Sequence, residues 1–182
     1  NIFTTTHDFA QGLVNDVSYH DDTNTVGAYL IDDAADPTDD SSDCAQDLDL
    51  FNTPTSVTGR IGNARSFVAA SSQYGIITRT TSGSGNCATG NTLSQISHTI
   101  EAWIWVNSTP SADQIIIGGQ DGTGTGRSNL FVTTSNRIGT YIGNKAYLSS
   151  NDAITTGGWI HVGYSYRHTS STDKAVDIYV NG

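Results

Sequence analysis

Short runs in which apolar and polar residues alternate recur along the chain, most clearly at residues 99–106. A period of two is typical of a β-strand, in which successive side chains point to opposite faces. We predict Ile100, Ala102, Ile104 and Val106 on one face, and Thr99, Glu101, Trp103 and Trp105 on the other. Further strands are predicted at residues 26–31, 65–69, 74–80, 114–118, 129–133, 137–142, 145–149, 159–166 and 175–180.

Turn-forming residues separate these strands, and no helical period persists beyond one turn. Gly143-Asn144 predicts a hairpin between 137–142 and 145–149, and a polar turn at 168–173 predicts another. Gly59 and Gly62 favour tight backbone turns. We expect residues 1–25 to form an N-terminal arm or first strand, and residues 32–49 to form an acidic loop. We therefore predict an all-β, two-sheet antiparallel jelly-roll sandwich over residues 26–182.

The last predicted strand is followed directly by Asn181-Gly182, a dipeptide that favours a type I′ hairpin turn. Such a turn leads into a second strand. We expect this sandwich to lack its last strands, so that the natural chain continues beyond residue 182 or another chain supplies the strand. An open edge strand would also allow assembly with neighbouring chains.

Charge narrows the range of partners. The chain has 18 acidic residues against 8 Lys and Arg, a formal net charge of −10. Nucleic acid is excluded because its recognition needs basic patches. Membrane insertion is not expected, since no apolar run is long enough to span a bilayer. Glu101 is the single Glu, which argues against the paired carboxylates of most glycoside hydrolases.

Cys44 and Cys87 are the only cysteines, and both lie in predicted loops. A disulfide between them is expected in an oxidising compartment. Two unpaired, buried thiols are the alternative.

Several segments, taken together and in order, resemble the laminin-G-like, concanavalin A-like lectin and glucanase jelly rolls. Residues 59–67 with Ser72-Gln73-Tyr74 resemble a "GxxGxAxxF…SxYV" segment, and 99–106 resemble "TISAWV". Residues 157–166 resemble "GxWHHVALTY", and 177–182 resemble "LYVNG". Upstream, 28–32 and 40–42 resemble "YxFD…DSSG". The resemblance covers residues 26–182.

The resemblance implies a calcium site at the rim of the sandwich, with Asp32 as the best-matching ligand and Asp36, Asp39 and Asp40 beside it. A solvated acidic loop is the alternative. Within the same motifs, we expect Trp159 and Tyr164 to pack in the core and His161 to make a buried hydrogen bond.

An exposed tryptophan needs a cover, which can be a glycan, a partner chain or a loop. The candidate ligand-binding residues are Trp105, Glu101 and Trp103 on one strand face, with Tyr141 on the adjacent hairpin. We expect a non-catalytic, extracellular carbohydrate-binding or adhesion module, with Ca²⁺ as a candidate cofactor. The alternative is a structural subunit or decoration of an extracellular filament, surface layer or virion. A glycoside hydrolase is a remote third hypothesis.

Overall fold

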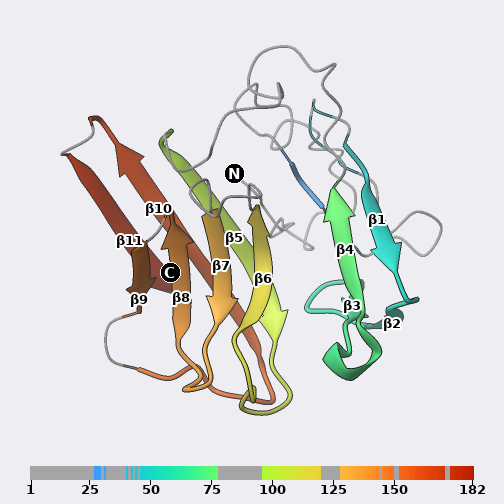
Figure 1. Ribbon diagram of the computed structural model, residues 1–182. Helices are drawn as coiled ribbons and strands as arrows, with labels where there is room; N and C mark the ends of the chain where they lie inside the picture. The colour runs from blue at the N-terminus through green and yellow to red at the C-terminus, as the bar shows by residue number, and fades with distance from the viewer. Residues whose placement is uncertain are drawn as a thin grey trace, which may run out of the picture. The chain divides into compact units, whose positions relative to one another are not determined.

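A computed structural model of the chain describes residues 27–29, 31, 40, 42, 44, 46–77, 96–119, 128–143, 145–149, 152–170 and 173–182. These residues form eleven strands and one short 3-10 helix, and every strand pair is antiparallel (Figure 1). The predicted all-β, antiparallel class is confirmed. The chain divides into two compact units, residues 1–89 and residues 90–182.

The second unit contains a four-stranded sheet in the order β6-β7-β8-β9. Its strands are β6 (Gln114–Gly119), β7 (Ser128–Val132), β8 (Ile138–Ile142) and β9 (Lys145–Leu148). Ile142 pairs with Lys145 across a two-residue turn, in which Gly143 has φ 61°. The predicted hairpin is therefore confirmed, and each predicted strand agrees with its observed strand to within one residue at either end.

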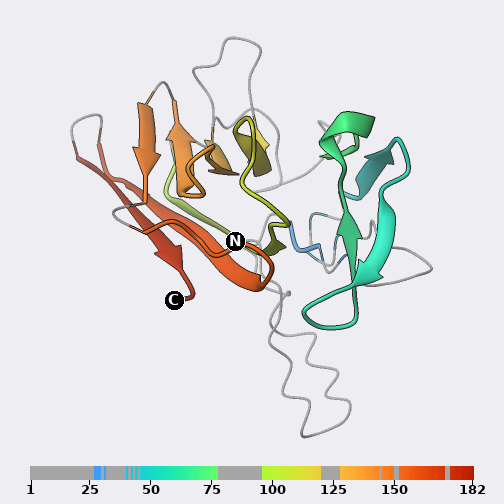
Figure 2. The same ribbon diagram turned by 90° about the horizontal axis from the view of Figure 1, so that it is seen from below.

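A three-stranded sheet in the order β11-β10-β5 forms the other layer of this unit. Its strands are β5 (His98–Trp105), β10 (Trp159–His168) and β11 (Lys174–Val180). The hairpin predicted between β10 and β11 is confirmed by seven paired positions, from Val162↔Val180 to His168↔Lys174. Figure 2 shows the two sheets of this unit as two layers.

The core lies between these two sheets. Ile100 and Ala102 of β5 are buried, as the alternation of polar and apolar residues predicts. The core also takes alternate residues of β10 and of the facing strands: Ile160, Val162, Tyr164, Tyr166, Leu130, Val132, Ile138 and Ile142. Each fully buried aliphatic side chain contributes about 1.5–3 kcal/mol through removal of apolar surface from water.

One hydrogen-bonded cluster joins the two sheets through the core. Ser128 Oγ of β7 lies 2.5 Å from Tyr164 OH of β10 and 2.6 Å from His98 Nε2 of β5. His98 Nδ1 lies 2.9 Å from the carbonyl oxygen of Ile96. Because a carbonyl only accepts, Nδ1 is the donor in that bond, and in the matching neutral tautomer Nε2 is an acceptor. One of the two hydroxyls then donates to Nε2, and the other donates to its hydroxyl neighbour.

Gly163 of β10 pairs with Glu101 of β5. We expect the Gly163→Ala variant to be destabilised by about 1–3 kcal/mol. A Cβ there would lie 2.9 Å from both the Glu101 Cβ and the Ile100 carbonyl oxygen. The carbonyl belongs to the backbone, so relief requires the two strands to separate. Urea unfolding measures the loss. Gly158→Ala is the control, because a Cβ at Gly158 meets no atom within 4 Å.

The first unit contains two pairs of strands. β1 (Leu48–Phe51) pairs with β4 (Tyr74–Ile77), and β2 (Thr55–Thr58) pairs with β3 (Asn63–Ser66). The turn between β2 and β3 is closed by a hydrogen bond from Gly59 N to Gly62 O, and Gly62 has φ 58°. The predicted tight turn at the two glycines is confirmed.

Sequence patterns are less accurate in this unit. No strand is present among described residues 27–29 and 31; Tyr29 makes only an isolated bridge to Asp40. Ile31 has φ 54°, which ends any extended run. The strand predicted at 65–69 ends at Ser66, and the chain turns into the 3-10 helix η3 (Ala69–Ser71).

The reason for this early ending is a side-chain amide. Gln73 Oε1 accepts a hydrogen bond from Val68 N, and Gln73 Nε2 donates to the carbonyl of Asn52. These bonds take backbone groups that a longer strand would have used for pairing. Strands β1 and β2 were not predicted, and β1 begins inside the segment expected to be an acidic loop.

Candidate functional site

The outward-facing side of the three-stranded sheet carries aromatic residues from all three strands. Strand register pairs Trp105 with Trp159, Trp103 with His161, and Gly163 with both Glu101 and Tyr179. Paired residues share a face, and Ile100 and Tyr164 on the alternate positions are buried against the other sheet. We call this surface the aromatic face and define it by Glu101, Trp103, Trp105, Trp159, His161 and Tyr179.

The rings of the aromatic face contact one another in pairs. The Trp105 and Trp159 centroids lie 5.9 Å apart, edge to face, and those of Trp103 and His161 lie 5.3 Å apart. Trp105 is 46% exposed and Tyr179 is 42% exposed. Trp105 Nε1 donates to Asn107 Oδ1 at 2.9 Å, which fixes the orientation of the indole. The aromatic face is therefore an apolar surface whose rings are fixed by their contacts and by this hydrogen bond, with hydrogen-bonding groups beside it.

Glu101 provides the charge of this face. Its carboxylate lies 3.7 Å from His161 Nε2. Burial raises the pKa of Glu101, and the neighbouring His161 partly offsets that rise. A carboxylate that is partly desolvated and has an imidazole beside it is a good acceptor for a ligand hydroxyl.

Two expectations about the core are wrong here. Trp159 and His161 point to the outer face and are half-exposed, whereas Tyr164 is fully buried as expected. The physical reason is the pairing register, which places Trp159 and His161 opposite Trp105 and Trp103. The histidine whose ring hydrogen-bonds to core hydroxyls is His98 instead, through part-buried contacts with Ser128 and Tyr164. The sequence could have shown this orientation. Side chains of a strand alternate between its two faces, so a buried Tyr164 places Trp159 and His161 on the outer face.

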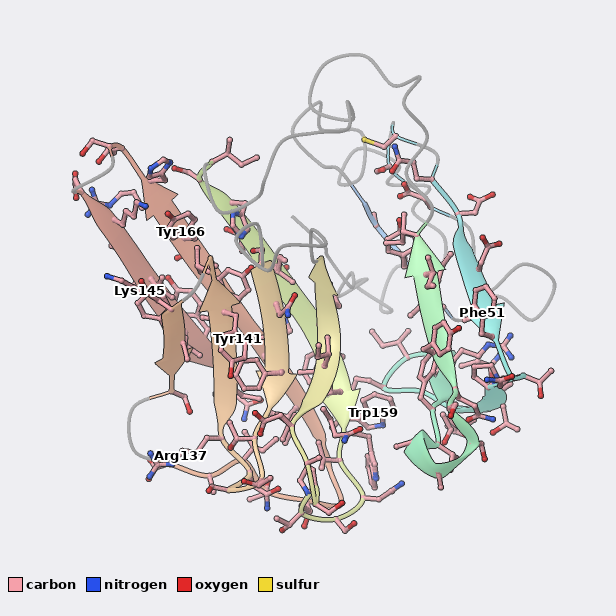
Figure 3. All side chains as sticks on the ribbon, in the orientation of Figure 1. Phe51, Arg137, Tyr141, Lys145, Trp159 and Tyr166 are labelled. Carbon is pink, nitrogen blue, oxygen red and sulfur yellow. The ribbon has the colours of Figure 1, made fainter. Side chains whose placement is uncertain are left out.

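Tyr141 lies on the other sheet and not with the tryptophans. It pairs with Asn129 and Ala146, on the side of the four-stranded sheet that faces away from Ser128 and the core. Its ring stacks on Phe131 with centroids 4.7 Å apart. Figure 3 shows Tyr141 on this sheet, Arg137 in the turn that leads into β8, and Trp159 on the other sheet.

A hollow of about 400 Å³ lies over Tyr141. We call it the Tyr141 groove; its lining residues are Asp113, Phe131, Thr133, Thr134, Ser135, Arg137, Tyr141 and Ala146. Sequence reasoning found only Tyr141 among them. The others come from three separate segments, which strand pairing alone brings together.

Of the four aspartates predicted to bind calcium, only Asp40 is among the described residues; Asp32, Asp36 and Asp39 lie outside them. The Asp40 carboxylate is buried and accepts three backbone N–H bonds, from Ala28 at 2.9 Å, Ser42 at 3.0 Å and Gln46 at 2.9 Å. These bonds hold three separated parts of the chain together. In the described ranges, no group of three or more His, Cys, Asp or Glu side chains is placed to hold a metal ion.

Of the two cysteines, Cys44 is among the described residues. Cys44 is disulfide-bonded, and its N–H donates to Ser42 Oγ at 3.2 Å. Cys87 lies outside the described residues.

Ser128 and His98 form a serine–histidine contact that sequence reasoning did not find. Such contacts occur in hydrolases, but Ser128 is 0% exposed and its hydroxyl is shared with Tyr164. The pair therefore lacks access to a substrate, and it serves to join the sheets.

Comparison with known proteins gives one family. Residues 79–182, more than half of the chain, match the family model described as the concanavalin A-like lectin/glucanases superfamily, of laminin-G type. Comparisons with curated proteins and with solved structures gave no match.

The matched range includes strands β5 to β11, and with them the aromatic face and the Tyr141 groove. Across the portion of the chain that the structure describes, no helix has the length and apolar character needed to cross a membrane. The family predicted from the sequence motifs is confirmed, and the chain belongs to the concanavalin A-like lectin/glucanases superfamily.

Proposed function

We propose that this chain is a non-catalytic, extracellular carbohydrate-binding or adhesion module and that its aromatic face contacts the glycan. The observation that carries the proposal is the gathering of three tryptophans, His161 and Tyr179 on one outward sheet face. Sugar rings have apolar C–H faces that pack on aromatic rings, and hydroxyl edges that hydrogen-bond to carboxylates. A Trp-rich platform beside Glu101 offers both kinds of contact.

The carboxyl groups available on the aromatic face favour binding without catalysis. Glycoside hydrolysis requires two carboxyl groups that flank the scissile bond. Glu101 is the single Glu of the chain, and the ionisable group beside it is His161, at 3.7 Å. An imidazole does not replace the second carboxylate in that mechanism.

The test is a glycan array probed with the wild-type chain and with the Trp105→Ala variant. We expect a defined glycan class to bind, and Trp105→Ala to weaken it about tenfold or more, because a central tryptophan dominates such contacts. Ile115→Ala is the matched control, since Ile115 is an exposed apolar residue on the other sheet. Failure of the folded wild-type chain to bind any glycan would refute the proposal.

We also propose calcium as an assisting cofactor, with Asp32, Asp36 and Asp39 as its candidate ligands; the buried Asp40 carboxylate instead accepts three backbone N–H bonds. The same array is run in calcium and then in chelator. Binding that disappears in chelator and returns with calcium supports the cofactor. Binding that is equal in both conditions removes calcium from the proposal and leaves the aromatic face unaffected.

A second candidate function, a structural subunit of an extracellular filament, surface layer or virion, is favoured by one observation. Among the described strands, β11 pairs only with β10, so its outer edge is open. A groove of about 690 Å³ runs beside it, lined by Ala146, Tyr147, Ser149, Val176, Asp177, Ile178 and Tyr179. An added strand would fill both. Light scattering that finds large particles in the absence of glycan would favour this function.

A further inference from the structure

We propose that the Tyr141 groove is a second glycan-binding site, separate from the aromatic face, and that it takes a sugar residue bearing a carboxylate, a uronic acid. The inference names a site and a ligand class beyond the proposed function. Three features of the groove carry it: a stacked aromatic floor, a guanidinium that makes no ion pair with any described residue, and a hydrogen-bonded turn at the rim.

The floor is preorganised by stacking. Phe131 is 2% exposed and lies parallel to Tyr141, with ring planes 14° apart. Phe131 therefore supports one face of the Tyr141 ring, which is itself only half-buried. A ring held in this way presents a fixed apolar platform, so a sugar that packs on it loses little extra conformational entropy.

Arg137 supplies the positive charge of the groove. Ion pairs within 4.0 Å in the described part of the chain join His161 to Glu101 and Arg167 to Asp173, and neither includes Arg137. Asp113 also lines the groove, but its Oδ1 accepts a hydrogen bond from Thr134 N at 3.3 Å. Since Arg137 makes no ion pair within 4.0 Å with Asp113 or with any other described carboxylate, its guanidinium is suited to a ligand carboxylate, which it can bind through two parallel hydrogen bonds.

The segment that carries Arg137 is fixed by its own backbone. Thr133 N donates to Arg137 O at 2.9 Å, and Asn136 N donates to Thr133 O at 3.0 Å. Thr133 Oγ1 accepts from the N–H groups of Ser135 and Arg137, at 3.2 and 3.1 Å. The turn therefore holds the Cα of Arg137 in one place before a ligand arrives, which lowers the entropy lost on binding.

The ligand class follows from combining these groups. A volume of about 400 Å³ is at the small end of ligand sites and fits a short oligosaccharide. A neutral sugar would offer Arg137 no carboxylate, and an anion without hydroxyls would add no hydrogen bond to Asp113, which already accepts one from Thr134 N. A uronic acid packs its ring on Tyr141, gives its carboxylate to Arg137 and donates its hydroxyls to Asp113.

The experiment is isothermal titration of the full chain with trigalacturonate, with neutral galactotriose and with a sulfated galactotriose. We expect trigalacturonate to bind at least tenfold more tightly than either of the other two. Arg137→Gln should weaken trigalacturonate binding at least tenfold. Arg167→Gln is the matched control, because it removes the same charge from an exposed pair elsewhere in the same unit and should leave binding unchanged.

The floor is tested separately. Tyr141→Ala should weaken binding, whereas Tyr141→Phe keeps the ring and should retain it. If Arg137→Gln and Arg167→Gln have equal effects on binding, the proposed site is wrong. It is also wrong if the wild-type chain does not bind trigalacturonate. Equal binding of the sulfated and uronate trimers would overturn the carboxylate assignment. Trp105→Ala leaves this binding intact if the two sites are separate, so failure of the aromatic-face proposal and failure of this one are distinguishable.

Discussion

Replacing Tyr164 by alanine should lower the free energy of unfolding of the second unit by about 3–5 kcal/mol, the range for removal of a large buried aromatic side chain. Tyr164 is fully buried between the two sheets, and its hydroxyl contacts both Ser128 and His98. The variant loses the packing of the ring and also leaves a cavity beside two polar groups. Urea unfolding followed by tryptophan fluorescence measures the change, because all three tryptophans lie in this unit.

Tyr164→Phe separates packing from hydrogen bonding. The ring remains, and His98 Nε2 still lies 2.6 Å from Ser128 Oγ, so neither group is left without a partner. The expected loss is therefore about 1–2 kcal/mol, close to that of one ordinary hydrogen bond. A Tyr164→Phe variant as unstable as Tyr164→Ala would contradict the packing account and assign the stability to the hydrogen-bonded cluster.

The stabilities of the wild type and of Tyr164→Phe should also depend differently on pH in the alkaline range. Burial raises the pKa of Tyr164 to about 12, an increase that the hydrogen bond with Ser128 partly offsets. Between the ordinary tyrosine pKa of about 10 and this value, the unfolded chain releases the phenol proton and the folded chain keeps it. Wild-type stability is thus complete below about pH 10 and falls by up to about 3 kcal/mol toward pH 12. Tyr164→Phe should lack this part of the decline.

Sequence patterns predicted the second unit well because several of its strands alternate between polar and apolar residues and two of its hairpins have short turns. The strand at 99–106 and the Gly143-Asn144 hairpin have local signals, and the structure confirms both. The orientation of Trp159 was mistaken because aromatic residues are compatible with a core or with a surface. Only pairing with Trp105 decides between them, and that contact joins residues distant in sequence.

The first unit was harder because side chains determine its backbone. The Gln73 amide and the Asp40 carboxylate bind backbone N–H groups of residues far from them in sequence, and such bonds leave no periodic signal. The Tyr141 groove was largely missed for a related reason. Asp113, Phe131 and Ala146 come from three separate segments, and no motif links them.

Removal of the disulfide that we expect between Cys44 and Cys87 should destabilise the first unit by about 4 kcal/mol. The cross-link would close a loop of about 40 residues and so restrict the unfolded chain by roughly this free energy. Cys44 lies between the Asp40 hydrogen bonds and strand β1. Hydrogen exchange measured by mass spectrometry should therefore show faster exchange of β1 and β4 in the Cys44→Ser variant.

The matched comparison uses Cys44→Ser, Cys87→Ser and the double variant. If the two cysteines are bonded to each other, each single change breaks the same bond, so the double variant should be no less stable than either single one. Exchange in β5 and β10 of the second unit serves as the internal reference and should not change. Two thiols that react with a thiol reagent in the unfolded, unreduced wild-type protein would contradict the bond and leave the alternative of unpaired cysteines.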